Sequence, residues 1–321
     1  MTWWAGIDLG GTVLKAVAVA ADGTVIARAA QPIHDGVDAV TDWIARTNAL
    51  LGEFEQQHGR ATAVGVSAPG LASPDGRCIA HLPGKLAGVQ GLDWSAALDG
   101  SPRTVVLNDA HAALVGEAWI GAARGRQDVI LLTLGTGVGG AVLAQGRLLR
   151  GAIGRAGHLG HMSLNPEGPR SIVGMPGAVE GMVGECTIGD RTRGRFRSTA
   201  DLLAAHRQGD AAATAVWLRS VRLLGCAVAS YINLFDPELV VIGGGIANAS
   251  DDLFAPLRAE LDRIEWRPGG HAVPVVPAAL GEWAGAIGAA REAMLGDESS
   301  NAKAPPAKAP GSAGPPGPPQ S

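Results

Sequence analysis

Two glycine turns, each at the end of an apolar stretch, constrain the fold of this 321-residue chain more than any other feature. The first apolar stretch leads into residues 8–12 (DLGGT), and the second, residues 129–134, leads into residues 135–140 (GTGVGG). A further apolar stretch follows each turn, so each segment predicts a strand, a glycine turn and a strand. Because the pattern returns about 125 residues later, the sequence predicts two related halves that face one cleft.

The two turns have the composition of phosphate-binding loops. Glycine lacks a Cβ, so backbone amides can approach phosphate oxygens closely, and a flanking threonine hydroxyl adds a donor. One such turn alone would be read more simply as a tight hairpin, but a third glycine run at residues 243–245 favours the phosphate interpretation. The candidate phosphate-binding residues of the two turns are Gly10, Gly11, Thr12, Gly135, Thr136 and Gly137.

A dinucleotide-binding motif is the main alternative for the second turn. Gly135, Gly137 and Gly140 satisfy the GxGxxG pattern after a strand. That motif requires a helix next, whereas residues 141–150 contain a Gln145-Gly146 turn and continue as a second strand. The sequence therefore disfavours a dinucleotide site, and it contains no GxxxxGK[ST] loop either.

Composition narrows the class of protein. Apolar runs alternate with Ala- and Leu-rich helical stretches, which predicts an α/β fold. A formal net charge of −4 gives no electrostatic case for a nucleic-acid partner, and three distant cysteines supply neither a disulfide framework nor a metal pair. The first residues lack a signal-peptide pattern, and no stretch approaches about 20 uninterrupted apolar residues. We therefore expect a cytoplasmic protein with no membrane partner.

A set of motifs along the chain resembles a known family. They are DLGGT at 8–12, APG at 68–70, ND at 108–109, LGTGVGG at 134–140, GxxGxxGH ending at His161, and PELVVIGGG at 237–245. In this order and at these spacings they are similar to the motifs of the ROK sugar kinases and related repressors. The resemblance implies a two-domain α/β fold of the actin/hexokinase-like ATPase type with a central cleft. It also implies ATP-dependent phosphorylation of a sugar hydroxyl, with ATP and Mg²⁺ as cofactors, and a possible homodimer.

The same resemblance sets the expected domain boundaries. We expect an N-terminal α/β domain over residues 1–109, a C-terminal α/β domain over 110–280, and a helix over 281–296 that joins the first domain. Residues 297–321 are rich in proline and nearly devoid of large apolar side chains. Such a segment cannot bury enough surface to offset its ordering entropy, so we expect a disordered tail.

Asp109 is the predicted general base. Phosphoryl transfer to a sugar needs a carboxylate that accepts the hydroxyl proton. Asp109 follows the strand expected at 104–107 and opens the helix expected at 110–123, whose dipole favours the ionised carboxylate. Asp109 could instead only cap that helix. Asn108 offers both a donor and an acceptor to a sugar hydroxyl.

The resemblance implies roles for further residues. Asp8 matches the carboxylate that the family places near magnesium, and Gly70 lies in a segment that lines the sugar site. Lys15 could assist a phosphate or be an ordinary strand lysine, and Trp94 could stack on a sugar or pack in the core. The residues expected to border the adenosine are Gly243, Gly244 and Gly245.

The sequence departs from the family at its zinc motif. The family pattern CxCGxxGCxE falls on residues 171–180, where the three thiol positions read Ser171, Val173 and Ala178 while Glu180 keeps its place. Valine and alanine cannot ligate a metal, so we predict no structural zinc. We expect apolar packing at Val173 and Ala178 to replace it.

A second departure lies at the sugar site. His158 stands where the family has a glutamate, three residues before His161. A carboxylate accepts two hydroxyl hydrogen bonds, whereas a neutral imidazole accepts one and donates one. We therefore expect the acceptor to be a hexose or related polyol whose hydroxyl pattern differs from that of glucose. The predicted substrate-binding residues are Gly70, Asn108, His158, His161 and Glu180; a metal site on the two histidines is the weaker alternative.

Two other function classes compete with a sugar kinase. A sugar-responsive regulator of the same family would carry a DNA-binding segment before the DxGGT motif, whereas this sequence reaches Asp8 almost at once. A catalytically silent sugar- or nucleotide-binding protein would fit the altered zinc motif and the missing glutamate. The presence of Asp109 favours the enzyme.

Overall fold

Two five-stranded sheets with the same plan form the frame of the molecule. The structure is a computed structural model that describes residues 2–303 apart from 35, 37–38, 85 and 99–102. The N-terminal sheet has the order β3-β2-β1-β4-β7, and the C-terminal sheet has the order β10-β9-β8-β11-β12. In each, three antiparallel strands are followed by two parallel ones. The prediction of two related α/β halves of the actin-like ATPase type is confirmed.

The strands form where apolar runs end at turn residues. The N-terminal sheet consists of β1 (Trp3–Leu9), β2 (Val13–Ala20), β3 (Val25–Pro32), β4 (Val64–Ala68) and β7 (Thr104–Asn108). The C-terminal sheet consists of β8 (Val129–Leu134), β9 (Val138–Ala144), β10 (Arg147–Leu148), β11 (Leu239–Gly243) and β12 (Val275–Pro277). Because β8 turns directly into the antiparallel β9, no helix follows the GxGxxG residues, and the dinucleotide alternative is excluded.

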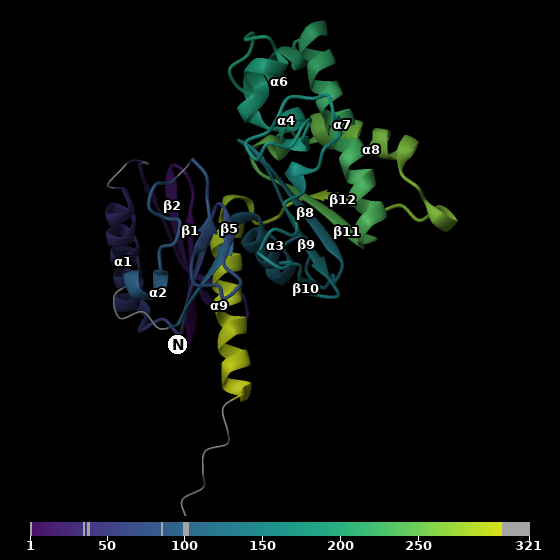
Figure 1. The fold of residues 1–321 in the computed structure, drawn as a ribbon. Helices are drawn as coiled ribbons and strands as arrows, with labels where there is room; N and C mark the ends of the chain where they lie inside the picture. The colour runs from purple at the N-terminus through teal and green to yellow at the C-terminus, as the bar shows by residue number, and fades with distance from the viewer. Residues whose placement is uncertain (1, 35, 37–38, 85, 99–102, 304–321) are drawn as a thin grey trace, which may run out of the picture.

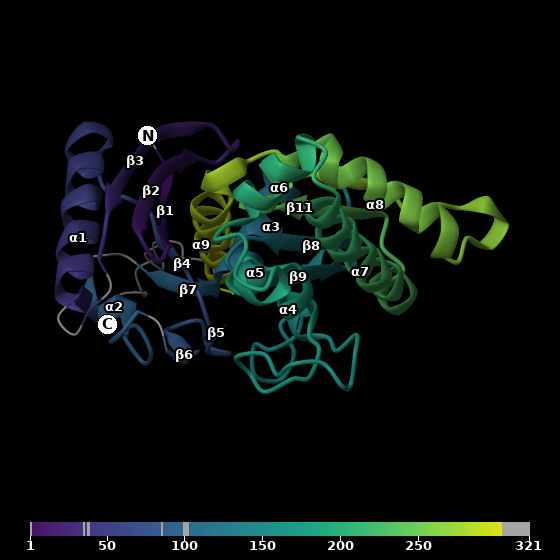
Figure 2. The ribbon, with the colours of Figure 1, turned by 90° about the horizontal axis from the view of Figure 1, so that it is seen from above.

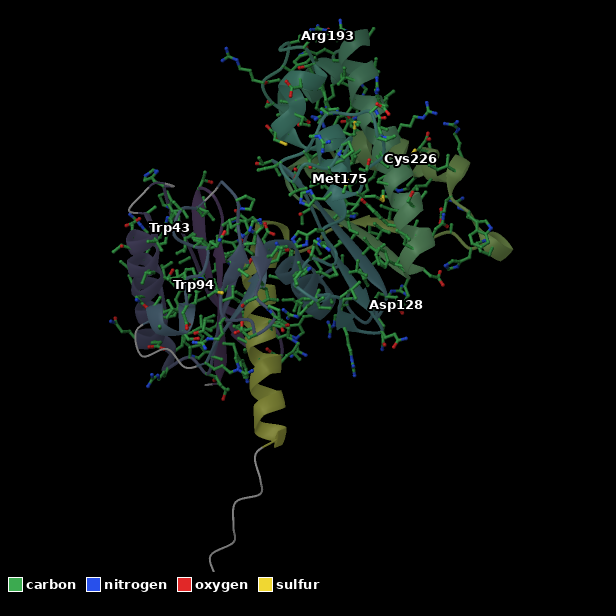
Figure 3. All side chains as sticks on the ribbon, viewed as in Figure 1. Trp43, Trp94, Asp128, Met175, Arg193 and Cys226 are labelled. Carbon is green, nitrogen blue, oxygen red and sulfur yellow. The ribbon has the colours of Figure 1, made fainter. Side chains whose placement is uncertain are left out.

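The N-terminal half has its own core beneath α1 (Ala39–His58) and α2 (Trp94–Ala97). Trp3, Trp43 and Trp94 are fully buried there, and Figure 3 shows the last two inside this half. A small sheet of β5 (Leu71–Ala72) and β6 (Ile79–His81) adjoins it. Trp94 is therefore a packing tryptophan, and its alternative role of stacking on a sugar is wrong.

The helices of the C-terminal half lie together on one side of its sheet (Figures 1 and 2). They are α4 (Val179–Val183), α5 (Ile188–Arg191), α6 (Thr199–Arg207), α7 (Ala211–Phe235) and α8 (Asp251–Ile264), with short 3-10 turns η1 (Leu159–His161), η2 (Glu185–Thr187), η3 (Gly245–Ala249) and η4 (Pro268–Gly270). Among the described helices α7 alone is long and apolar enough to span a membrane by length and composition. It packs against α6, α8 and α4, and Trp217, Val221 and Leu224 belong to the C-terminal core.

Two helices lie between the halves. α3 (Asp109–Ile120) and α9 (Ala284–Lys303) share the most extensive helix contact of the molecule, and α9 also packs on β1 and β4 (Figures 1 and 2). A Cβ at Gly288 would lie 1.7 Å from the Ala112 carbonyl oxygen, so only glycine allows this close crossing.

The last helix differs from its predicted bounds at both ends. Residues 281–283 form a separate 3-10 turn, η5 (Gly281–Trp283), before α9 begins. At the other end α9 continues to Lys303, so the expected start of a disordered tail at residue 297 is wrong. The remainder of the predicted tail, residues 304–321, lies outside the described residues.

Candidate active site

A cavity of about 530 Å³ opens between the two sheets at the ends of β1, β8 and β11. Its walls combine residues from both halves and from the two central helices. They include Asp8, Asp109, Glu117, Thr133, Gly243, Gly244, Gly245, Asn248, Glu282 and Gly285. The structure therefore brings Asp8, Asp109 and the third glycine run to one site, as the sequence predicts.

The two glycine turns lie beside this cavity, outside its lining. The first begins where the Gly10 amide donates to the Val13 carbonyl at 3.1 Å, and the second begins where the Gly135 amide donates to the Gly137 carbonyl at 3.0 Å. Thr12 and Thr136 at the turn tips are exposed. Each turn is thus a tight hairpin with an exposed hydroxyl, which is the geometry that a phosphate group can approach.

Asp8 is a carboxyl group held in a confined place. Its Oδ1 accepts a hydrogen bond from the Ser67 hydroxyl at 2.7 Å. Its side chain lies against α9, since a Cβ on Gly285 would approach Oδ1 to 2.7 Å. Burial, together with the nearby charge of Asp109, raises the pKa of Asp8 to about 6, although the Ser67 hydrogen bond and Lys15 oppose the shift.

Asp109 occupies the first position of α3, with an exposed side chain that faces the cleft. The N-cap of this helix is Asn108, whose Oδ1 accepts from the amides of Ala110 and His111 at 3.0 and 3.2 Å. Because Asn108 fills the capping position, the alternative that Asp109 only caps the helix is disfavoured. The carboxylate of Asp109 also gains from the positive end of the α3 dipole.

Asn108 uses its hydrogen-bonding capacity within the protein. Its Nδ2 donates to the Gly70 carbonyl at 2.9 Å and to Asp109 Oδ1 at 2.8 Å, while Oδ1 holds the start of α3. An amide has two donor hydrogens and two acceptor lone pairs, so all four are occupied here. In this structure Asn108 positions Asp109 and Gly70; its direct contact with a sugar hydroxyl stays a prediction.

The Asp8 carboxylate at the cleft fits a magnesium ion. Magnesium is usually held by one or two carboxylates together with phosphate oxygens and waters. Asp8 supplies hard oxygen ligands, and the repulsion from Asp109 that helps to raise the pKa of Asp8 is the kind that a divalent cation relieves. The donor set therefore suits Mg²⁺ carried with a nucleotide.

Glu117 is a site residue that the sequence analysis missed. Its carboxylate is fully buried and accepts from the amides of Ala122, Ala279 and Leu280, at distances between 2.7 and 3.1 Å. These bonds tie the end of α3 to the chain entering α9, beside the cavity. An acidic residue in an otherwise apolar helix, residues 110–120, was the available signal.

Three histidine rings meet at the predicted sugar site. The rings of His158 and His161 stack with centroids 6.3 Å apart, and His111 meets His158 edge-on at 5.8 Å. His111 Nε2 lies 3.0 Å from the Ala156 carbonyl, which can only accept, so this nitrogen carries the proton. His111 was not predicted, because its position in α3 gives no sign of the contact.

The His111 and His158 rings are neutral near pH 7. Burial lowers the pKa of His111 to about 4, and burial together with the neighbouring His161 lowers the pKa of His158. Both ring nitrogens of His158 and Nδ1 of His161 are buried without a hydrogen-bond partner in the described part of the chain. A neutral His158 therefore has one donor and one acceptor available to a bound molecule.

Glu180 contacts the second glycine turn from α4. It lies in the first turn of α4, and its Oε2 accepts from the Val138 amide at 3.1 Å. A Cβ on Gly137 would come within 2.2 Å of the same oxygen, so the carboxylate occupies the space that the glycine leaves. Its predicted contact with the substrate stays a prediction.

The segment that replaces the zinc motif differs from expectation. Ala178 is buried, but Val173 is 51% exposed, so the predicted apolar packing at Val173 is wrong. Backbone bonds hold the segment instead: the Ser171 amide donates to Met175 at 2.9 Å, and the Gly174 amide to Ser171 at 2.8 Å. Across the described ranges, no group of three or more His, Cys, Asp or Glu side chains could hold a metal ion. The absence of zinc stays a prediction.

The chain is similar in sequence and structure to several known sugar kinases. The glucokinase of Thermotoga maritima is 33% identical over 306 residues, covering 89% of this chain and 95% of that protein. The N-acetylmannosamine kinase of Vibrio cholerae is 31% identical over 284 residues, covering 85% and 92%. A solved ROK family glucokinase from Streptomyces griseus, in complex with glucose and AMPPNP, is 28% identical with a TM-score of 0.75, covering 91% of this chain and 99% of that one.

The family assignment follows from a match that spans nearly all described residues. The model of the ROK family matches residues 4–294, which include both glycine turns, Asp109, the histidine cluster and the third glycine run. The two sheets of this chain have the same strand plan, and a cavity lies between them, which agrees with this match. The chain is a member of the ROK family.

Proposed function

We propose that this protein transfers the γ-phosphoryl group of ATP to a hydroxyl of a hexose or related polyol, with Asp109 as the general base. The observation that carries the proposal is the exposed carboxylate of Asp109, which faces a cavity bordered by Gly243, Gly244 and Gly245. The glucokinase and N-acetylmannosamine kinase relatives support the reaction class. The glucose and AMPPNP complex of a relative supports the donor.

The chain supplies positioning and proton acceptance. Asn108 holds Asp109 through a 2.8 Å hydrogen bond, and the α3 dipole keeps its carboxylate ionised and ready to accept the proton of the attacking hydroxyl. When bound, Mg²⁺ offsets the negative charge of the phosphates. Asp8 is the residue that would hold it. The glycine turns present amides and the Thr12 and Thr136 hydroxyls to the phosphate chain.

The acceptor sugar is proposed to meet His158, His161 and Gly70. The neutral His158 would accept one hydrogen bond and donate another, where a glutamate would accept two. Sites that hydrogen-bond a substrate hydroxyl discriminate by about 10⁴-fold or more against mismatched analogues. We propose that this exchange moves the preference away from glucose.

The remaining expectations are part of the same proposal. The protein acts in the cytoplasm as a homodimer, without nucleic-acid or membrane partners, and without structural zinc. Metal analysis of protein purified without chelators checks the zinc statement, and one tightly held zinc per chain would contradict it. Light scattering of the purified chain checks the oligomeric state.

The direct test measures ADP release from ATP and Mg²⁺ with a panel of hexoses, amino sugars, N-acetylated amino sugars and inositols. We expect turnover with at least one member and a kcat/KM for it above that for glucose. Glucose as the best acceptor by a wide margin would refute the specificity proposal alone. No turnover with any member, despite nucleotide binding, would favour the silent binding protein.

The His158→Glu variant tests the specificity step. It restores two acceptor positions, so we expect kcat/KM for glucose to rise at least tenfold relative to that for the best wild-type acceptor. His158→Gln is the matched control, because a neutral amide keeps one donor group and one acceptor group. An unchanged substrate ranking in His158→Glu would remove His158 from this role.

A further inference from the structure

Arg191, at the end of α5, is a cation that bonds only uncharged groups in the described part of the chain. Its Nη1 donates to the Ser220 hydroxyl at 2.6 Å, and its Nε to the Thr187 hydroxyl at 3.2 Å. Its Nη2 donates to the carbonyls of Gly184 and Val183 at 2.9 and 3.2 Å. The guanidinium therefore organises the segment between α4 and α5.

That segment holds the second glycine turn. The Glu185 amide donates to the Gly135 carbonyl at 3.0 Å, and the Cys186 amide donates to the Thr136 carbonyl at 2.8 Å. A trans peptide is planar, and its N–H points away from its C=O. Fixing the carbonyls of Gly135 and Thr136 therefore fixes the amides of Thr136 and Gly137 on the opposite side.

The charge of Arg191 is not neutralised by an acid. None of the described carboxylates lies within 4 Å of its guanidinium, unlike Arg195, which pairs with Asp210. Burial lowers the pKa of Arg191, and the neighbouring titratable group that opposes this shift is the Cys186 thiol. A guanidinium stays protonated in proteins, so a positive charge persists behind the turn. Arg193, two residues after Arg191, is labelled at the top of the C-terminal half in Figure 3.

We propose that Arg191 is a positioning residue for the phosphates of the donor: it fixes the backbone of the β8–β9 turn and supplies a positive charge that the phosphates neutralise. This inference rests on the proposed use of ATP. Buried cations without an acidic partner are costly, and a bound polyanion offsets that cost. The effect of Arg191 should therefore grow with the number of phosphates on the ligand.

Calorimetric binding of Mg·ADP and of adenosine to the full chain tests the proposal. In Arg191→Gln we expect the Kd for ADP and the KM for ATP to rise about tenfold, while the Kd for adenosine and the KM for the sugar stay within twofold. Arg191→Lys keeps the charge and should recover part of the loss. Arg219→Gln, at an exposed position on α7 next to Ser220, removes the same charge without these bonds and should behave as wild type.

Ser220→Ala provides a milder variant if Arg191→Gln does not fold. It removes the 2.6 Å bond but keeps the charge, so we expect about a threefold weaker ADP affinity and unchanged adenosine affinity. Equal losses for ADP and adenosine, or wild-type ADP binding in Arg191→Gln, would overturn the role of Arg191. Absence of ADP binding by the wild type would instead overturn the proposed function itself.

Discussion

The two halves of the molecule share one frame but fill it differently. In the N-terminal sheet, β1 ends with Asp8-Leu9 before Gly10, and in the C-terminal sheet, β8 ends with Thr133-Leu134 before Gly135. On the neighbouring parallel strand, Ser67 pairs in register with Asp8, whereas Gly243 pairs with Thr133. The same backbone positions thus carry a carboxylate bonded to a serine hydroxyl in one half and a threonine beside a glycine in the other.

The third parallel strand extends the contrast. β7 leads through Asn108 into α3 with Asp109 at its start, and β12 leads through Ala278 towards α9 without an acid at the corresponding place. The N-terminal sheet therefore carries Asp8 and leads into Asp109, and the C-terminal sheet carries Gly243 at the glycine-lined wall of the cavity. Two sheets with the same topology can therefore take different roles when matching positions carry different side chains.

Asp109→Asn should have the largest effect of these variants. The loss should appear in the chemical step and leave nucleotide binding unchanged. We expect kcat to fall by about 10²-fold or more, because general base catalysis typically contributes 10²- to 10⁴-fold. The affinity for Mg·ADP should change little. Steady-state kinetics and calorimetry check this, and near-normal turnover would remove Asp109 from the role of base.

Asp8→Asn should stabilise the nucleotide-free protein. The pKa of Asp8 rises from 3.8 to about 6 on folding, so the folded state binds the extra proton, and that stability is lost as the pH rises through about 6. Above this pH, the variant should gain roughly 3 kcal/mol in unfolding free energy, at about 1.4 kcal/mol for each pKa unit. Urea unfolding at several pH values checks this.

The pH dependence is the control for that prediction. The gain should shrink as the pH falls from about 6 towards 3.8, because the wild-type carboxyl is then protonated in the folded state and increasingly protonated in the unfolded state. A gain of equal size at pH 4.5 and pH 7.5 would show that the substitution acts through packing. A loss of stability at pH 7.5 would contradict the raised pKa.

Gly243→Ala tests the C-terminal half, because it adds a side chain where this half has only a glycine. An added Cβ would lie 3.0 Å from the Ala278 Cβ, at the wall of the cavity. Narrowing a packed site by one methyl typically costs 1–3 kcal/mol, so we expect the KM for ATP to rise about tenfold. Gly52→Ala, in α1 outside the cavity, is the control, since an added Cβ there also meets nothing within 4 Å. Equal KM values for the two variants would argue against a role for this wall.

Lys15→Met should have the smallest effect. The Lys15 ammonium bonds the Glu282 carbonyl at 3.0 Å and lies 3.3 Å from the Glu282 carboxylate, whose side chain is 68% exposed. Such an exposed pair typically contributes no more than about 1 kcal/mol. Thermal unfolding and the KM for ATP check this. A tenfold rise in KM would instead give Lys15 the phosphate role that the sequence left open.

The frame could be predicted from the sequence because it depends on local patterns. The glycine turns, the strand ends and the start of α3 at Asn108-Asp109 all follow from residues within a few positions of one another. The convergence of Asp8, Asp109 and Gly243 was expected from the resemblance to the ROK sugar kinases. The repeated strand, glycine turn and strand independently predicted two related halves that face one cleft.

Contacts between distant segments could not be predicted in this way. The Glu117 carboxylate bonds amides at Ala279 and Leu280, more than 160 positions away, and no local pattern encodes that pairing. The prediction that Val173 packs in an apolar contact failed for the same reason. Backbone hydrogen bonds, rather than side-chain burial, hold its segment. The environment of Arg191 depends on Ser220, on another helix.

The position of α9 has a consequence for biosynthesis. Gly6 and Gly65, in the first sheet, lie beneath the carbonyls of Ala286 and Ala289, with added Cβ atoms 1.9 Å from each oxygen. A ribosome delivers the first sheet before the whole C-terminal half and this helix only after it. One face of the N-terminal sheet therefore stays uncovered while the C-terminal half is synthesised, and the nascent chain completes its first domain only once α9 has emerged.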